Sequence, residues 1–266
     1  MKLNELRIVI RGAGDLASAI GWRFTMGGFQ VIMIEAARPL AVRRRVSFCE
    51  AVWDEAAEVQ GLKACRIERP ADAGGVLKRR EIPILVDPNL ERLSELAPHV
   101  LVDAVLAKKN LGVRMDLAPL VIGVGPGFCA GRDVHMVVES KRGHNLGRVL
   151  TEGEPAADTG VPGVIEGYAA ERVLRAPADG VFEAGVELGA MVSAGQTVAE
   201  VAGIPLQSEI GGLVRGLIRP GLEVKRGMKV GDVDPRGDIT YLDTISDKGL
   251  AVAGGVLEAV CRVYNR

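Results

Sequence analysis

The sequence predicts an α/β protein in which a Rossmann-like domain built on a parallel sheet is followed by a small all-β domain. Two observations predict the first domain: apolar runs alternate with helical segments, and a glycine-rich turn separates the first strand from the first helix. An internal repeat predicts the second. The expected domains are residues 1–160 and 161–245, and residues 246–266 are expected to form a helix that packs back on the protein.

The composition is that of a globular protein and argues against several classes of partner. The 266 residues include 34 glycines and 4% aromatic residues, which favours tight turns and short strands. A net charge of −1 gives no overall field that would attract nucleic acid or a membrane, so neither is expected as a partner. Four separated cysteines and an N-terminus without a signal-like apolar segment favour a reduced, cytoplasmic protein.

The first βαβ unit is predicted over residues 6–35. An apolar strand leads into the turn Gly12-Ala-Gly14-Asp-Leu-Ala17, and a helix and a second strand follow, with Glu35 at the end of that strand. The spacing Gly-x-Gly-x-x-Ala is that of a dinucleotide-binding turn. Gly12 would make the turn, Gly14 would let a pyrophosphate approach the backbone, and Ala17 would let the helix pack closely on the strand.

Charged residues around this turn give mixed signals about a nucleotide. Glu35 follows Gly12 by 23 residues, a position from which an acidic side chain hydrogen-bonds a ribose hydroxyl. Asp15 would stabilise the helix dipole but repel a pyrophosphate, so the glycines could also serve only the tight turn. Arg43 opens a run of three arginines after the second strand, which could clamp a phosphate or form a solvated face.

The remainder of the first domain is expected to complete a parallel sheet covered on both faces. Strands are predicted at 63–68, 82–87 and 100–107, and helices at 47–58 and 89–97. Asp103 lies inside one of the apolar runs, so its carboxylate must be paired or sit at a strand end.

A second glycine-rich stretch follows an apolar strand at 120–124 and is dense in ionisable residues. We expect this loop and residues 12–17 to lie at one edge of the sheet and to frame a ligand cleft. Arg132 would be the main phosphate contact, and His135 or Glu139 would position a polar group of the ligand. A solvated charged face is the alternative. The candidates here are Gly125, Gly127, Gly131, Arg132, Asp133, His135 and Glu139.

An internal repeat lies beyond a predicted boundary at 159–163. Gly180, Gly189, Val192, Gly195, Val198 and Val201 recur 32 residues later as Gly212, Gly221, Val224, Gly227, Val230 and Val233. Two equivalent sets of short strands with approximate twofold symmetry are expected. The segment resembles a biotinyl/lipoyl-like barrel-sandwich, in which the hairpin between the halves carries a cofactor on a lysine. Here that hairpin, residues 201–206, has no lysine, so a carrier role is not expected.

The C-terminal helix is predicted to begin after Ser246, a favourable N-cap residue, and to run to about Val263. Gly254 and Gly255 lie inside it, and each should weaken a helix by about 1 kcal/mol relative to alanine. Close packing of the helix against the sheet would account for both glycines.

Taken together, the motifs resemble the YqeB-like family of selenium-dependent molybdenum hydroxylase accessory proteins. The resemblance rests on Ile10-Arg-Gly-Ala-Gly-Asp-Leu-Ala, Pro39-Leu-Ala-Val-Arg-Arg, Val102-Asp-Ala-Val-Leu-Ala-Lys, Gly125-Pro-Gly-Phe-Cys-Ala-Gly-Arg-Asp-Val-His, Gly160-Val-Pro-Gly and Gly227-Met-Lys-Val-Gly-Asp-Val-Asp-Pro-Arg-Gly-Asp. The family pattern has threonine where this chain has Cys129. The resemblance implies a protein that helps to mature or supply the molybdenum cofactor of a hydroxylase, with that hydroxylase or its maturation proteins as partners.

Three functions stay open at this stage. The first is an accessory protein that binds a small phosphorylated ligand, such as a molybdopterin dinucleotide or another nucleotide. The second is an NAD-dependent oxidoreductase, supported by the glycine turn and Glu35. The third is a metal-dependent enzyme using Asp133, His135, Glu139 and His144, although the two histidines lack a usual ligand spacing. The sequence leaves open whether any reaction is catalysed and whether the chain forms a homo-oligomer.

Overall fold

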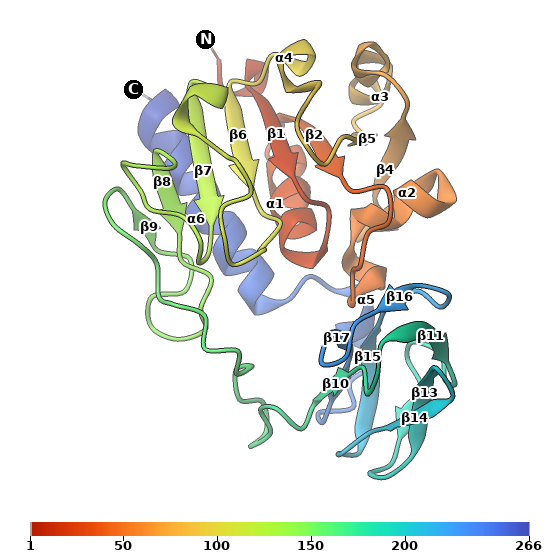
Figure 1. The fold of residues 1–266 in the computed structure, drawn as a ribbon. Coiled ribbons are helices and arrows are strands. Elements are labelled where there is room, and N and C mark those ends of the chain that lie inside the picture. The colour runs from red at the N-terminus through yellow and green to blue at the C-terminus, as the bar shows by residue number, and fades with distance from the viewer. Residues whose placement is uncertain (1, 266) are drawn as a thin grey trace. The chain divides into compact units, whose positions relative to one another are not determined.

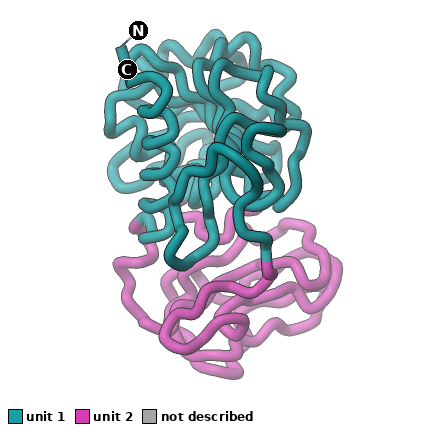
Figure 2. Tube along the Cα trace, turned by 90° about the vertical axis from the view of Figure 1, so that its left-hand side faces the viewer, with its two compact units in different colours: residues 1–39, 47–158, 245–266 teal, residues 40–46, 159–244 magenta. Residues whose placement is uncertain are grey.

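The computed structural model describes residues 2–265 and divides into two compact units (Figure 1, Figure 2). Unit 1 comprises residues 1–39, 47–158 and 245–266, and unit 2 comprises residues 40–46 and 159–244. Residues 40–46 therefore belong to unit 2 although they interrupt unit 1 in the sequence, which the three expected consecutive ranges did not anticipate.

Unit 1 is built on a nine-stranded sheet of order β3-β4-β5-β2-β1-β6-β7-β8-β9. Its strands are β1 (Arg7–Arg11), β2 (Gln30–Glu35), β3 (Ala56–Val59), β4 (Leu62–Ile67), β5 (Ile82–Val86), β6 (Val100–Asp103), β7 (Leu120–Val124), β8 (Met136–Val138) and β9 (Val149–Leu150). Neighbouring strands run parallel except in the edge pairs β3·β4 and β8·β9. The predicted α/β class with a mainly parallel sheet is confirmed.

Helices cover both faces of this sheet. They are α1 (Asp15–Met26), α2 (Ala51–Asp54), α3 (Ala73–Lys78), α4 (Leu93–Leu96) and α6 (Asp247–Tyr264), with 3₁₀ turns at Leu3–Glu5, Phe48–Glu50, Pro70–Asp72 and Met115–Leu117. Helices α1 and α6 pack together behind the sheet in the view of Figure 1. The Oγ of Ser246 accepts a hydrogen bond from the N–H of Gly249, so the predicted N-cap of α6 is confirmed.

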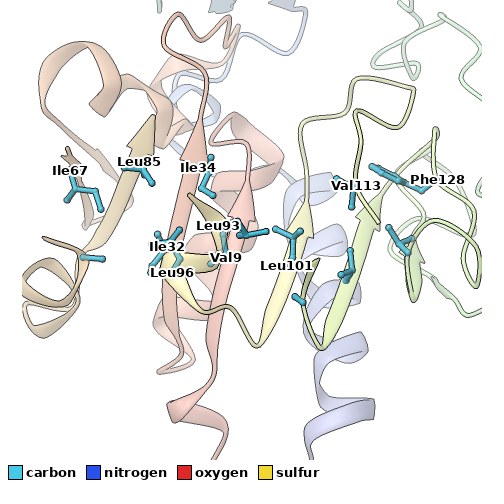
Figure 3. Close-up of a cluster of buried hydrophobic side chains, with 14 of the residues drawn as sticks. Val9, Ile32, Ile34, Ile67, Leu85, Leu93, Leu96, Leu101, Val113 and Phe128 are labelled. Atoms are coloured by element: carbon cyan, nitrogen blue, oxygen red, sulfur yellow. The ribbon is translucent and has the colours of Figure 1, made fainter. Parts of the chain in front are cut away.

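The second face of the sheet carries a buried cluster formed by alternate strand residues. Val9, Leu101 and Val121 come from adjacent strands, and Leu93 and Leu96 come from α4 (Figure 3). Side chains of a strand alternate between faces, so Arg11 and Asp103, two residues beyond Val9 and Leu101, emerge on this same face at the carboxyl ends of β1 and β6.

Two predicted helices are much shorter than expected. Residues 47–58 form a 3₁₀ turn and α2, and the chain then turns into β3 because Glu55 takes a left-handed backbone conformation with φ of 63°. Residues 89–97 contain only α4, since Leu90 and Ala97 have φ of 62° and 44°. Left-handed residues cannot continue a right-handed helix, so each one sets a boundary.

Unit 2 consists of two four-stranded sheets in which all paired strands are antiparallel. The first has the order β10-β17-β15-β12 and the second β14-β13-β11-β16. The strands are β10 (Val173–Arg175), β11 (Gly180–Ala184), β12 (Met191–Val192), β13 (Thr197–Val201), β14 (Ile204–Gln207), β15 (Gly212–Leu217), β16 (Glu223–Val224) and β17 (Lys229–Asp234). A 3₁₀ turn at Arg44–Val46 and the helix α5 (Thr240–Asp243) complete the unit.

Strand pairing in unit 2 follows the sequence repeat. A shift of 32 residues converts β10, β11, β12 and β13 into β14, β15, β16 and β17, and it converts one sheet order into the other. The pair Gly180↔Val224 thus corresponds to Gly212↔Val192. The turn glycines Gly195 and Gly227 also share a φ of 81°. The predicted internal repeat is confirmed at the level of individual strand pairs.

Candidate functional site

The carboxyl ends of the central parallel strands bring several loops of unit 1 to one edge of the sheet. β2 lies on one side of β1 and β6 on the other, so the strand order changes direction at β1. Ligands of open α/β sheets bind at such switch points. The loops at this edge are residues 12–14 after β1, 104–114 after β6 and 125–128 after β7.

Gly12 is required by the backbone itself. Its φ is 98°, and its N–H donates a 2.7 Å hydrogen bond to the carbonyl of Ile34. A Cβ at this position would lie 3.1 Å from the carbonyl oxygen of Ala104 in the loop after β6. Gly12 therefore makes the turn and allows two loops to meet, as the sequence predicted for the first glycine.

Gly14, in contrast, is not required by any neighbour in the described structure. Its φ of −70° suits any residue, and a Cβ would meet no atom within 4 Å. Gly14 is the N-cap of the 12-residue helix α1 but provides no capping side chain. The first N–H groups of a helix have no intrahelical partner and form the positive end of its dipole. Glycine here leaves these donors open to an anion.

Glu35 connects the end of β2 to the glycine turn. Its Oε2 accepts a 2.7 Å hydrogen bond from the N–H of Ala13, and its Oε1 accepts one of 2.7 Å from the N–H of Ala36. Burial raises the pKa of this carboxyl, and the two N–H donors lower it to a smaller extent. The side chain predicted to contact a ribose thus lies directly beside the turn and holds its shape.

The two remaining predicted residues of the turn have separate roles. Asp15 is the first residue of α1, where its carboxylate stabilises the helix dipole. Ala17 is fully buried, which permits the close approach of helix and strand expected for the third small residue. The structure therefore places Gly12, Gly14, Asp15, Ala17 and Glu35 together.

A buried ion pair lies beneath the turn and was not among the predicted site residues. Arg11 donates to the Oδ2 of Asp103 at 3.1 Å, to the carbonyl of Leu111 at 3.1 Å and to the carbonyl of Pro88 at 2.6 Å. It joins β1 and β6 to the loops that follow β5 and β6. Burial raises the pKa of Asp103, and the nearby guanidinium opposes this shift. The isolated Asp103 in an apolar run was the sequence signal for such a pair.

The loop after β6 brings a lysine to the same edge. Leu106 and Lys108 have left-handed φ values of 58° and 61°, which are unfavourable for residues other than glycine and often occur at functional sites. Within residues 2–265, the exposed ammonium of Lys109 has no hydrogen-bond or ion-pair partner. The backbone of Lys109 packs against Gly127, where a Cβ would lie 2.6 Å from the backbone nitrogen of Lys109. Lys109 was not among the predicted site residues.

The glycines after β7 serve the packing of neighbouring loops. Gly125 has a φ of 75° and donates to the carbonyl of Val138 at 2.9 Å, and a Cβ there would overlap the Oγ of Ser140. Gly127 has a φ of 110°. Because β1, β6 and β7 are parallel neighbours, these glycines and Gly12 share one edge of the sheet, as predicted.

The rest of this stretch lies where the parallel strands β7 and β8 begin, at the end of the sheet opposite the Gly12 turn, which corrects the prediction for Arg132. The chain must return to the start of β8, since β8 is parallel to β7. The backbone N–H of His135 donates to the carbonyl of Val121 at 2.9 Å, and the Nδ1 of the His135 side chain accepts from the Val121 N–H at 3.0 Å, near the beginning of β7. Arg132 is exposed and pairs with Asp133 and Glu154. Gly131, Arg132, Asp133 and His135 therefore do not join the Gly12 turn.

Two further predicted residues have structural contacts elsewhere. Glu139 is buried after β8, and its carboxylate accepts 2.7 Å hydrogen bonds from the N–H groups of Lys141 and Ala156. Arg43 belongs to unit 2, where it donates to the carbonyls of Tyr241 and Thr244 at 2.7 and 3.1 Å.

The metal-site alternative gains no support from the geometry. Among residues 2–265, no three side chains of His, Cys, Asp or Glu are arranged to hold a metal ion. Asp133 accepts hydrogen bonds from the Cys129 N–H and from Arg132, and His135 is engaged by β7, so these two do not converge with Glu139 and His144.

No helix in the described part of the chain is both long and apolar enough to cross a bilayer.

Comparison with known proteins supports the YqeB-like part of the resemblance found in the sequence. The chain is 46% identical over 259 residues to "Uncharacterized protein YqeB" of Escherichia coli (strain K12), which covers 97% of this chain and 48% of that protein. The resemblance to YqeB extends over nearly the whole chain. The chain spans about half the length of this curated relative. No family model matches the sequence.

Solved structures give weaker similarities. The ectoine utilization protein EutE (DoeB) from Ruegeria pomeroyi, in a product-bound structure, is 15% identical with a TM-score of 0.25, covering 79% of this chain and 60% of that one. An aspartoacylase family protein from Mesorhizobium loti is 10% identical with a TM-score of 0.27, covering 86% of this chain and 85% of that one. We draw no conclusion about fold or function from scores this low.

Proposed function

We propose that this protein is an accessory factor for the maturation of a selenium-dependent molybdenum hydroxylase, and that its turn at residues 12–14 binds a phosphorylated cofactor or nucleotide. The family resemblance supports the biological role, and the site geometry supports the ligand class. A molybdopterin dinucleotide carries the pyrophosphate that this proposal requires. The hydroxylase or its maturation proteins would be the partners.

The observation that carries the ligand assignment is the contrast between the two glycines of the turn. Gly12 has a φ of 98° and a close neighbour, so the fold explains it. Gly14 has an ordinary φ of −70° and open space where a side chain would be. A glycine that no neighbouring atom requires, placed at the N-cap of a helix, leaves the room that the close approach of a phosphate needs.

Lys109 supplies the positive charge in this proposal, in place of Arg132. It lies on the loop after β6, whose Ala104 meets Gly12 and whose Lys109 meets Gly127. A lysine ammonium neutralises phosphate charge and offsets the repulsion expected from Asp15. The second candidate, an NAD-dependent oxidoreductase, is favoured by Glu35, because its carboxylate lies beside the turn where a ribose would bind.

Unit 2 completes the proposal as a barrel-sandwich of the biotinyl/lipoyl type that carries no cofactor. Its two repeat-related sheets support the fold, and the hairpin at Ala202 and Gly203 has no lysine. We assign this unit to docking with the partner enzyme. An intact mass that includes a biotinyl or lipoyl group would contradict the assignment.

The test of function has two arms. Thermal-shift and calorimetric titrations of the full chain with cytidine and guanosine diphosphates, ADP, NAD and NADP define the ligand class. Mass spectrometry of small molecules that co-purify with the chain then tests for a pterin. Preferential binding of NAD or NADP, with no pterin recovered, would favour the oxidoreductase over the accessory factor.

A further inference from the structure

A pocket in unit 2 lies between the two repeat-related connections of its sheets. Residues 184–188 comprise the end of β11 and the first part of its connection to β12, and Leu217 and Pro220 come from the equivalent region of β15 and the segment that leads to β16. Arg44 and Arg45 from residues 40–46 complete its lining. The two connections correspond to each other under the 32-residue repeat.

A departure from the repeat brings the arginines to this pocket. The pairing of β15 with β17 shifts register between Val214 and Gly216. The N–H of Leu217 donates to the carbonyl of Val42 at 2.8 Å, and its carbonyl accepts from the Nε of Arg44 at 2.9 Å. Residues 42–44 thus bind along the end of β15, and this contact holds Arg44 at the pocket.

Arg45 provides an exchangeable anion contact. Its Nε donates to the Oδ1 of Asp243 at 2.6 Å, and the two side chains are 57% and 53% exposed. Exposed ion pairs of this kind contribute little stability because water competes for both partners. The carboxylate of Asp243 therefore occupies a place that an oxyanion of a ligand can take, with the guanidinium offering paired N–H donors.

The other residues that line the pocket indicate the chemistry of the rest of the ligand. Val186, Leu188 and Pro220 are aliphatic and at least partly exposed, Leu217 is buried at the pocket, and Glu187 adds one exposed carboxylate. Glu187 would repel a second negative group. We propose that this pocket binds a small molecule with an oxyanion at one end and a short aliphatic body. The site is independent of the turn at Gly12.

The test is a titration of the full chain followed by NMR of its methyl groups. Butyrate and butyl phosphate serve as probes, since they place a carboxylate and a phosphate on the same aliphatic body. Shifts at Val186, Leu188 and Leu217 are expected for at least one probe, and the tighter probe defines the oxyanion. Absence of shifts at these methyls with both probes at millimolar concentration would overturn the proposal.

Variants separate this site from a structural role of the same residues. Arg45→Gln should weaken binding about tenfold, whereas Asp243→Asn should tighten it because the internal competitor is removed. Arg175→Gln, in β10 and outside the pocket, should change nothing. Gly14→Val should also leave this binding intact, which distinguishes it from the nucleotide site. Equal affinity of Arg45→Gln and the wild type, or weaker binding by Asp243→Asn, would contradict the proposal.

Discussion

Glu35 accepts a 2.7 Å hydrogen bond from the backbone N–H of Ala13, between the two glycines of the first turn. A side chain at the end of β2 thereby fixes the loop that follows β1. Because burial raises the pKa of this carboxyl, the turn gains a dependence on pH. The consequences can be measured with and without a ligand.

The first prediction concerns pH. When a carboxyl has a higher pKa in the folded chain than in the unfolded chain, its ionisation destabilises the fold. Its contribution to the free energy of unfolding therefore falls as pH rises from the unfolded pKa of about 4.3 through the folded pKa. Glu35→Gln should therefore lose less stability than the wild type between mildly acidic and neutral pH. Urea unfolding followed by tryptophan fluorescence reports on unit 1, since Trp22 and Trp53 both lie there. The exposed control Glu58→Gln should follow the wild type; parallel curves for Glu35→Gln would contradict the prediction.

The second prediction concerns the buried pair of Arg11 and Asp103. Asp103→Ala leaves a buried guanidinium without its carboxylate and should lower the free energy of unfolding by about 3–5 kcal/mol. The matched control is Asp72→Ala, which breaks the exposed pair with Arg69 and should leave the unfolding midpoint almost unchanged. Equal losses in the free energy of unfolding for the two variants would contradict the prediction that breaking the buried Arg11–Asp103 pair costs more than breaking an exposed pair.

The third prediction compares neighbouring glycines of α6. A Cβ at Gly255 would overlap the carbonyl oxygen of Gly147 and lie 2.8 Å from Val138, whereas one at Gly254 would meet only the side chain of Arg23 at 3.6 Å. Gly254→Ala should stabilise the protein by about 1 kcal/mol through helix propensity. Gly255→Ala should destabilise it. Thermal unfolding of both variants tests this, and a gain in stability for Gly255→Ala would be the contrary result.

The fourth prediction assigns Lys109 to the ligand. Loss of one charge-assisted contact costs about 1.5–3 kcal/mol, so Lys109→Gln should weaken nucleotide binding roughly ten- to a hundredfold. The fold should be unaffected because the side chain is exposed. Lys78→Gln, at the end of α3, is the matched control and should bind normally. Calorimetric titration of both variants decides whether the lysine contributes.

Local patterns in the sequence predicted the parts of the fold that depend on local chemistry. The apolar runs and glycines of the first βαβ unit, and the 32-residue repeat, each specify neighbours through periodicity or backbone conformation. The helix predicted after Ser47 failed because Glu55 is left-handed, which its residue type does not reveal. The place of residues 40–46 in unit 2 depends on contacts such as Val42 with Leu217, which local patterns do not encode.

The candidate site was predicted in part for the same reason. Gly12, Gly14 and Glu35 occupy fixed positions of a βαβ unit, so their meeting followed from spacing. The error at Arg132 arose because β7 and β8 are parallel and are joined without a helix. Their connection runs from the carboxyl end of β7 back to the amino end of β8. Residues close in sequence therefore lie at opposite ends of the strands.

The central claim is that the N–H groups around Gly14 receive a phosphate. The most direct measurement is calorimetric titration of wild type and Gly14→Val with the tightest nucleotide of the panel, with Gly74→Val as the control. Positions 14 and 74 are matched because a Cβ at either one meets no neighbouring atom within 4 Å. The proposal predicts that Gly14→Val weakens binding at least tenfold with only the small loss of stability that valine costs at an N-cap, while Gly74→Val binds as the wild type does. Equal affinity for Gly14→Val, or no nucleotide bound by the wild type, would contradict it.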